Sequence, residues 1–253
     1  VRTGKSTFIK RFMELAVLPA MEDESLKAVS TDELPQSAGG KTVMTTEPKF
    51  IPKEAVQITL GDGIQAKVRL IDCVGYMVDG AAGHVENGEE RMVKTPWSEK
   101  EIPFTQAAQI GTRKVIGDHS TIGIVVTTDG SVGELKRSAY IDAEKQTVDE
   151  LKKLGKPFIL LLNSTKPYSD ETLKLAEQLA ADYGVTVLPV SCEQLKKEDI
   201  FHILESVLKE FPVTQLDFHI PKWLEVLPAT HWLKTQVIDM ARELLKKVSH
   251  MKD

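Results

Sequence analysis

The first seven residues have the types and order of a loop that binds nucleotide phosphates. They read Val-Arg-Thr-Gly-Lys-Ser-Thr and open an amphipathic stretch. In such a P-loop, backbone N–H groups wrap the phosphates, the Lys side chain reaches the terminal phosphates and the Ser hydroxyl ligates Mg²⁺. The alternative is a turn followed by a helix that Ser6 caps. The sequence predicts a P-loop NTPase with a catalytic Lys5, a metal-binding Ser6 and nucleotide contacts from Arg2, Thr3, Gly4, Lys5, Ser6 and Thr7.

A second candidate element is the run Leu-Ile-Asp-Cys-Val-Gly at residues 70–75. An apolar strand that ends in Asp72 can hold Mg²⁺ through water, and the amide of Gly75 can approach the γ-phosphate. The D-x-x-G pattern is weak by itself. The same pattern is a strong indication of a nucleotide site when it follows a P-loop and a hairpin. A carboxylate buried at the end of a strand needs a partner, and Mg²⁺ would be that partner here. We therefore expect Asp72 to act in catalysis and metal binding, and Gly75 to contact the nucleotide.

A polar loop between these two elements supplies a third candidate. Residues 41–48 read Lys-Thr-Val-Met-Thr-Thr-Glu-Pro, with three hydroxyls in five residues. One Thr of such a loop can complete the Mg²⁺ shell and report the γ-phosphate. We favour Thr45, then Thr46, for this catalytic and metal-binding role. The alternative is that these Thr side chains make only local turns.

The residues after the strand at 157–163 bear on the choice of base. GTPases of this topology usually carry N-K-x-D there, and the Asp accepts hydrogen bonds from guanine. This chain reads Asn-Ser-Thr-Lys-Pro at residues 163–167, so Asn163 is present and the Asp is absent. The absence weakens selectivity for GTP and favours ATP. Asn163, and Ser191 in the loop that lies against the base, are expected to contact the nucleotide.

Two residues bear on the rate of hydrolysis. Tyr76 follows the D-x-x-G, where many GTPases place the Gln that orients the attacking water, so hydrolysis should be slow or assisted from elsewhere. Arg2 lies inside the P-loop, where its guanidinium can neutralise charge on the phosphates as an arginine finger does. The alternative for Arg2 is a solvent-exposed or carboxylate-paired side chain.

The remaining pattern predicts an α/β fold with a mainly parallel sheet. Residues 6–17 have the apolar spacing of a helix, residues 21–53 and 75–104 read as irregular, and strands at 55–60 and 67–72 flank a Gly-Asp-Gly turn. Strands and helices then alternate as βαβ units. The strands are expected at 121–127, 157–163, 185–190 and 216–221, and the helices at 140–154, 169–183, 198–210 and 231–248.

Composition excludes several classes of protein. The net charge of −5 argues against broad binding to nucleic acid or to anionic lipid. Two cysteines in 253 residues indicate a reducing, cytosolic setting, and no apolar run is long enough for a transmembrane segment. The sequence starts inside the P-loop motif, so we expect the first P-loop Gly and the buried strand before it to be missing.

With these residues in hand, the chain resembles the stage IV sporulation protein A family. The resemblance rests on residues 1–12 (VRTGKSTFIKRF), 32–50 (DELPQSAGGKTVMTTEPKF), 70–76 (LIDCVGY), 95–104 (TPWSEKEIPF), 111–116 (GTRKVI) and 119–130 (HSTIGIVVTTDG). It implies a translation-factor-type GTPase-like topology, with one antiparallel strand, that has turned to ATP. It assigns Lys5 and Ser6 to the nucleotide and Mg²⁺, Thr45 to a sensor role and Asp72 to the second metal-binding motif.

The resemblance also implies a biological role. In that family, ATP hydrolysis drives self-assembly of the basement layer of the bacterial spore coat in the mother-cell cytoplasm, on the outer forespore membrane. The implied partners are further copies of the chain, a small amphipathic membrane-anchoring peptide and other coat morphogenetic proteins. Residues 1–212 would form the ATPase domain, and residues 213–253 the start of a middle domain.

Two other functions fit the residues. One is a regulatory GTPase of the translation-factor class with a degenerate base-specificity loop, and nucleotide competition separates it from an ATPase. The other is a nucleotide-bound structural protein with almost no turnover, which phosphate release separates from both enzymes.

Overall fold

Three parallel strands form the centre of the structure. The structure is a computed structural model that describes residues 2–35, 48–59, 63, 65–78, 80–81, 85–86, 89–96 and 98–253. Strands β7 (Gly123–Thr128), β8 (Phe158–Asn163) and β9 (Val187–Val190) pair in that order, with Val125 opposite Leu160. All of β8 is buried, as expected for a strand covered on both faces. The alternation of strands and helices predicted for this half of the chain is confirmed.

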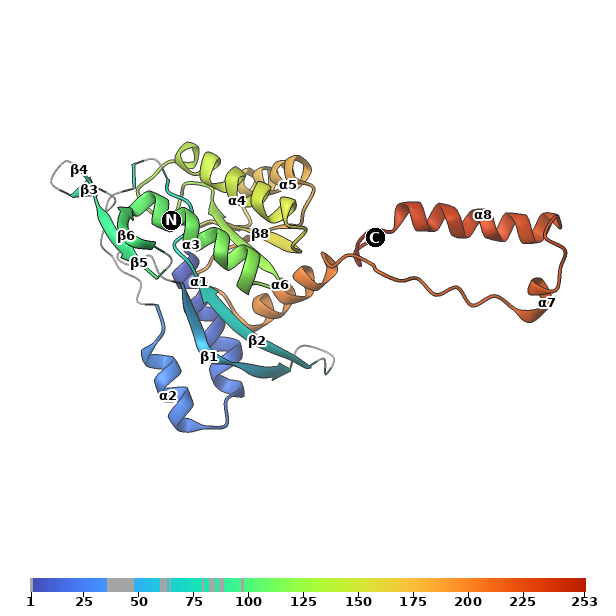
Figure 1. Ribbon diagram of the computed structural model, residues 1–253, viewed down its shortest axis with the longest axis horizontal. Coiled ribbons are helices and arrows are strands. Elements are labelled where there is room, and N and C mark those ends of the chain that lie inside the picture. Colours follow the sequence, from blue (N-terminus) through green and yellow to red (C-terminus); the bar gives the residue numbers. More distant parts are fainter. Residues whose placement is uncertain are drawn as a thin grey trace.

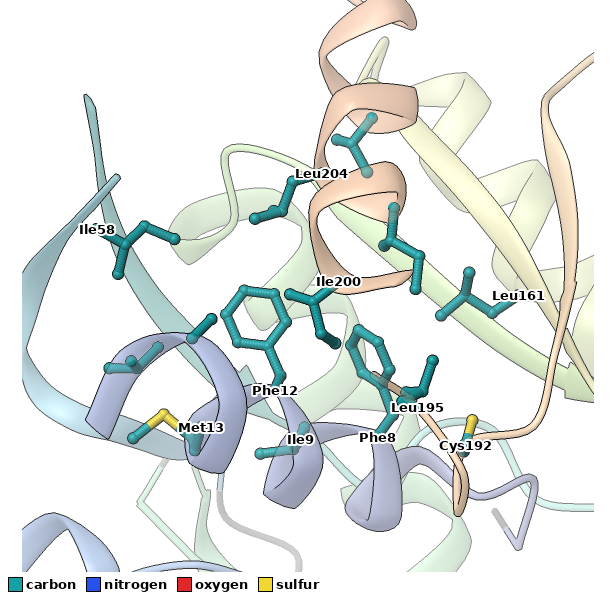
Figure 2. Close-up of a cluster of buried hydrophobic side chains, with 14 of the residues drawn as sticks. Phe8, Ile9, Phe12, Met13, Ile58, Leu161, Cys192, Leu195, Ile200 and Leu204 are labelled. Atoms are coloured by element: carbon teal, nitrogen blue, oxygen red, sulfur yellow. The ribbon is translucent and has the colours of Figure 1, made fainter. Parts of the chain in front are cut away.

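Helices cover both faces of this sheet (Figure 1). On one face, Ile159 and Leu161 of β8 pack in a core with Phe12 and Ile200, which is drawn in Figure 2. On the other face, Leu160 and Leu162 pack against the helix that connects β7 to β8 and the helix that connects β8 to β9. Alternate residues of one strand therefore enter opposite cores. The covering helices are α1 (Lys5–Phe12) and α6 (Lys197–Lys209) on the first face, and α4 (Ile141–Lys153) and α5 (Asp170–Tyr183) on the second. Helix α3 (Phe104–Lys114) contacts β5 (Met92–Thr95) and β6 (Ser98–Pro103).

The predicted hairpin is present. Strand β1 (Lys49–Thr59) pairs antiparallel with β2 (Gln65–Asp72), which ends at the Asp of the D-x-x-G. The helix predicted at 6–17 begins one residue earlier. After Phe12 it widens into a π-helical turn, Met13–Val17, and then tightens into a 3₁₀ turn, Leu18–Ala20. Pro19 lies in that last turn, where the helix ends.

Several elements were not predicted. Residues 21–53 and 75–104, predicted to be irregular, contain regular elements, and the strand predicted at 216–221 is absent. Helix α2 (Glu24–Asp32) lies in the segment read as a loop, and the Asp23 carboxylate caps it by accepting from the amides of Ser25 and Leu26. Residues 213–221 form no regular element, so no strand exists at 216–221. The other unpredicted elements include α3, β3 (Val85–Glu86), β4 (Glu89–Glu90), β5, β6, a π-helical turn at Val115–His119, a 3₁₀ turn at Arg137–Tyr140 and α7 (Lys222–Glu225).

A cavity of about 850 Å³ lies between the hairpin and the parallel sheet. Residues of β2 and β7, of α1, and of α3 and α4 line it, and the lining includes Thr3, Lys5 and Gly75. Within the described ranges, β2 pairs only with β1 and β7 only with β8. Among the described residues, one edge of each of these two strands therefore has no backbone partner.

Residues 213–253 form an arm that extends away from the sheet (Figure 1). It carries α7 (Lys222–Glu225) and α8 (Trp232–Lys247), and no residue of α8 is buried. The arm returns to the end of α6, where the Lys252 ammonium lies 2.9 Å from a Glu210 carboxylate oxygen. The helix predicted at 231–248 is thus confirmed, and its apolar side chains Met240, Leu244 and Leu245 are exposed.

Candidate functional site

The phosphate-binding motif stands at the start of α1. Gly4 is the N-cap, with φ of 93°, in the left-handed region that favours glycine. A Cβ at this position would collide with the side-chain amide of Asn163. Lys5, Ser6 and Thr7 form the first turn, so their free backbone N–H groups and the helix dipole favour an anion there. Gly4 and the first turn of α1 therefore offer backbone N–H groups to an anion.

The Lys5 ammonium and the Asp72 carboxylate are in contact. Lys5 begins α1 and Asp72 ends β2, so two charged groups 67 positions apart converge at one point. Their side chains are 28% and 15% exposed, so most of each lies away from water. Burial lowers the pKa of Lys5, and the nearby Cys73 acts in the opposite direction. The structure places a cation and a carboxylate beside the phosphate-binding turn.

The chain after Asp72 turns sharply at the Gly of the D-x-x-G. Gly75 has φ of 82° and shares the lining of the cavity with Lys5. Tyr76 is 2% exposed, packed inside the protein. Burial raises the pKa of its hydroxyl, and Arg113 beside it works in the opposite direction. A buried phenol does not present a group that orients water as Gln does.

Asn163 joins three loops at one edge of the sheet. Its Nδ2 donates to the backbone oxygen of Thr3 at 2.9 Å, and its Oδ1 accepts from the amide of Cys192 at 3.0 Å. Both ends of this buried amide are therefore bound to backbone, one in the phosphate-binding loop and one after β9. Ser191, partly buried, precedes Cys192 at the same edge. In this structure Asn163 holds the loops together, and its contact with nucleotide stays a prediction.

Arg2 has an unusual backbone conformation. Its φ is 62°, the only positive value for a non-glycine among the described residues. Its backbone oxygen accepts a hydrogen bond from the buried Tyr140 hydroxyl at 3.4 Å. A non-glycine residue in this sparsely populated backbone region is strained, and it keeps this conformation because the surrounding structure holds it there. Such residues are common at functional sites. Tyr140, from the turn before α4, had no signal in the sequence pattern that pointed to this contact.

The metal-binding set is only partly within the described residues. Thr45 and Thr46 lie outside them, so their role stays a prediction. Ser6 and Asp72 supply a hydroxyl and a carboxylate near the start of α1. Mg²⁺ in nucleotide sites is bound by one or two carboxylates together with phosphates and water, so this donor set fits the ion. In the part of the chain that the structure describes, no group of three His, Cys, Asp or Glu offers a separate site.

A polar cluster at the ends of β7 and β8 was missed by the sequence reasoning. Asp129 follows β7 and accepts hydrogen bonds from the amide and the hydroxyl of Ser131 and from the hydroxyl of Thr172. Ser164, which is 1% exposed, follows β8 in the same cluster. Polar residues directly after a buried strand were the signal available for it, since ligands bind outside the carboxyl ends of parallel strands.

Comparison with known proteins identifies the family. Residues 1–212 match the family model described as Stage IV sporulation protein A, ATPase domain, and residues 213–253 match the one for the middle domain of that protein. The chain belongs to the stage IV sporulation protein A family. It carries the part described as the ATPase domain, with a P-loop at the start of α1, so the resemblance and the P-loop α/β fold predicted from the sequence are confirmed.

Relatives match the whole of this chain. It is 49% identical over 253 residues to Stage IV sporulation protein A of Bacillus subtilis (strain 168), and 47% identical to that of Clostridioides difficile (strain 630). The match covers 100% of this chain and 51% and 52% of those proteins, so the chain spans about half the length of these relatives. Comparison with solved structures gives no significant match. Among the described residues, no helix has the length and apolar character needed to cross a bilayer.

The tether through Asn163 makes a testable prediction. Asn163→Ala removes both hydrogen bonds and leaves the Cys192 amide and the Thr3 carbonyl without their partner. Each buried group left unsatisfied costs about 1–3 kcal/mol, so we expect the free energy of unfolding to fall by about 2–4 kcal/mol in urea denaturation. Gln178→Ala, at an exposed position of α5, serves as the control and should change it by less than about 0.5 kcal/mol. Equal stability of the two variants would show that the tether is not holding the loops.

Proposed function

We propose that this member of the stage IV sporulation protein A family hydrolyses ATP at the turn before α1 and uses the hydrolysis to drive its own assembly into the basement layer of the spore coat. The observation that carries the proposal is the meeting of Lys5 and Asp72 beside the phosphate-binding turn. A positioned cation and a metal-binding carboxylate are the two charges that phosphoryl transfer requires.

Each residue has a defined part in this reaction. The backbone amides at Arg2 to Thr7 cradle the phosphates, and Lys5 neutralises charge on the terminal phosphate. Ser6 and Asp72, with Thr45, would hold Mg²⁺, and the ion would neutralise charge on the phosphates. Gly75 offers its amide to the γ-phosphate, and the Arg2 guanidinium lies along the phosphates. The support is the placement of all but Thr45 around the start of α1 and the end of β2.

Turnover is expected to be slow. Tyr76 occupies the position after the D-x-x-G and is buried, so the chain brings no Gln side chain to the attacking water there. A slow enzyme suits a protein that uses hydrolysis as a switch between two assembly states, because each molecule then needs few turnovers.

ATP is the proposed nucleotide. At the end of β8, Asn163 is followed by Ser-Thr-Lys, so no carboxylate stands where a GTPase accepts the N–H groups of guanine. Ser191, in the loop after β9, and Asn163 are the proposed contacts on the side of the base. Family membership supports this choice, since the matched family model is described as an ATPase domain.

Family membership also supports a proposal for the setting of the reaction. The relatives are named for a stage of sporulation. We place the protein in the mother-cell cytoplasm, peripheral to the outer forespore membrane, with further copies of itself, a small amphipathic anchoring peptide and other coat morphogenetic proteins as partners. Residues 1–212 act as the ATPase domain and 213–253 begin a middle domain.

The coupling of hydrolysis to assembly has a direct test. Purified protein is incubated with Mg²⁺ and either ATP or an ATP analogue with a non-hydrolysable β–γ bridge, and is then sedimented. We expect pelleted polymer to increase several-fold with ATP only, because a switch that depends on hydrolysis changes state only when the γ-phosphate leaves. Equal pelleting with the analogue would separate assembly from hydrolysis and contradict the proposal.

A further inference from the structure

The turn after β8 places a lysine where many GTPases carry an acidic residue. The turn reads Asn-Ser-Thr-Lys at residues 163–166. Counting from Asn163, Lys166 occupies the position of the Asp in N-K-x-D. Its side chain is exposed and makes no hydrogen bond or ion pair with any described residue. A positive charge therefore stands where a guanine-binding carboxylate would be, and it is free to meet a ligand.

The backbone around Lys166 is fixed by two hydroxyls. The amide of Lys166 donates to the Ser164 hydroxyl at 3.0 Å, and the amide of Thr165 donates to the Ser131 hydroxyl at 2.9 Å. Ser164 is 1% exposed, so it is held inside the protein. Backbone bonds to buried or anchored hydroxyls keep a short turn in one conformation. The position of the Lys166 Cα is thus set by the fold.

Asp129 anchors this arrangement. The hydroxyl of Ser131 donates to the Asp129 carboxylate at 2.6 Å. This bond orients the Ser131 hydroxyl oxygen so that it accepts a hydrogen bond from the Thr165 amide. Thr172, in the first turn of α5, donates to the other carboxylate oxygen at 3.3 Å. Burial raises the pKa of Asp129, but the hydrogen bonds from Ser131, Ser164 and Thr172 outweigh it and the pKa is lowered. A carboxylate that stays ionised keeps these hydroxyls in place.

The turn lies at the same sheet edge as the phosphate-binding loop. Asn163, one residue before the turn, bonds to the backbone of Thr3. The amide of Ser164 donates to the oxygen of Val190 at 2.9 Å, which ties the turn to the end of β9. A nucleotide with its phosphates at the start of α1 extends along this edge, because ligands of parallel sheets lie outside the carboxyl ends of the strands.

We propose that Lys166 reads the nucleotide base and selects adenine over guanine, held in register by Ser164, Ser131 and Asp129. The pairing edge of adenine presents a ring nitrogen with a lone pair, which accepts from an ammonium group. Guanine carries an N–H donor at that ring nitrogen and an exocyclic amine beside it, so a Lys166 ammonium placed at this position faces donors, and the acceptor oxygen of guanine lies on the other side of the ring N–H. Discrimination arises from donors left unpaired in the wrong complex. The inference rests on the proposed nucleotide site and names the residue that sets its specificity.

A charge reversal at this position tests the proposal. In Lys166→Asp the sequence regains a carboxylate three residues after Asn163, so GTP should bind more tightly and ATP more weakly. We expect the ratio of ATP to GTP affinity, measured by competition against a fluorescent nucleotide, to fall at least about tenfold, the scale of one discriminating polar contact. Inorganic tripolyphosphate has no base. Once the change seen in the control Lys174→Asp is divided out, its affinity for Lys166→Asp should stay within about twofold of its affinity for the unsubstituted protein.

Lys174→Asp is the matched control. Lys174 is exposed on α5, and its substitution makes the same change of charge away from the turn. It should leave the ATP to GTP ratio unchanged. An unchanged ratio in Lys166→Asp, the same shift in Lys174→Asp, or an equal loss for ATP, GTP and tripolyphosphate would each overturn the proposal.

A second variant tests the anchor without altering the lysine. Ser131→Ala removes the hydroxyl that accepts from Thr165, so the turn loosens while Lys166 is retained. We expect the ratio of ATP affinity to GTP affinity to fall several-fold, with the affinity for tripolyphosphate unchanged. An unchanged ratio would show that the Ser131 hydroxyl does not hold Lys166 in place. If the unsubstituted protein binds neither nucleotide, the proposed function fails. If it prefers ATP and Lys166→Asp keeps that preference, only this inference fails.

Discussion

Lys5→Ala is expected to lower the rate of phosphate release from ATP by at least about 100-fold, the usual loss when one preorganised charge at a transition state is removed. Lys5 begins α1, and its ammonium is held among partly buried groups beside Asp72. In such surroundings a cation acts on the terminal phosphate far more strongly than it would in water. The rate is measured by phosphate release at saturating ATP, and nucleotide affinity by competition binding.

Lys10→Ala is the control for this variant. Lys10 lies on the same helix but is exposed, and its ammonium is 3.8 Å from a Glu14 carboxylate oxygen. An exposed pair of this kind contributes little, so this variant should keep its rate within about twofold. A Lys5→Ala protein that turned over as fast as Lys10→Ala would remove Lys5 from the mechanism.

Asp72→Asn is expected to lower turnover by about 10- to 1000-fold while nucleotide binding without Mg²⁺ is kept or strengthened. The amide has nearly the same shape as the carboxylate but no charge for the metal. It also releases the Lys5 ammonium from its ion pair, which leaves that cation available to the phosphates. Phosphate release is measured over a series of Mg²⁺ concentrations, and binding in the presence of a chelator.

The matched substitution for this experiment is Asp142→Asn, in the exposed first turn of α4. It should leave both the Mg²⁺ dependence and the rate unchanged. If Asp72→Asn had the Mg²⁺ dependence and rate of this control, the metal-binding role of Asp72 would be wrong.

The local sequence pattern predicted the part of the fold in which strands and helices alternate, from β7 to α6. The strands β7 and β8 and the helix between them can be recognised from sequence, because the apolar pattern of each lies within a single element. The same holds for the start of α1, where the motif and the apolar spacing coincide. The approach of residues 5 and 72 was expected because the P-loop lysine and the carboxylate at the end of the hairpin strand were assigned to one Mg²⁺–nucleotide site.

The missed elements have weak local signals. Helix α3 buries Ala107, Ala108 and Gly111, small residues that give a faint apolar stripe. Strands β5 and β6 are short, and β6 includes the charged run Glu-Lys-Glu, so their pairing with each other defines them more than propensity does. The Asp129 cluster draws on Ser131, Ser164 and Thr172, which are up to 43 residues away in sequence, so no spacing rule reveals it.

The central claim is that this fold hydrolyses ATP at the Lys5 and Asp72 site, and phosphate release from equal concentrations of Mg–ATP and Mg–GTP tests it most directly. Purified protein and its Lys5→Ala variant are compared side by side. The account predicts release from ATP that exceeds release from GTP, requires Mg²⁺ and is lost in the variant. Release from ATP that is absent, or that is the same in the protein and in Lys5→Ala, would contradict it.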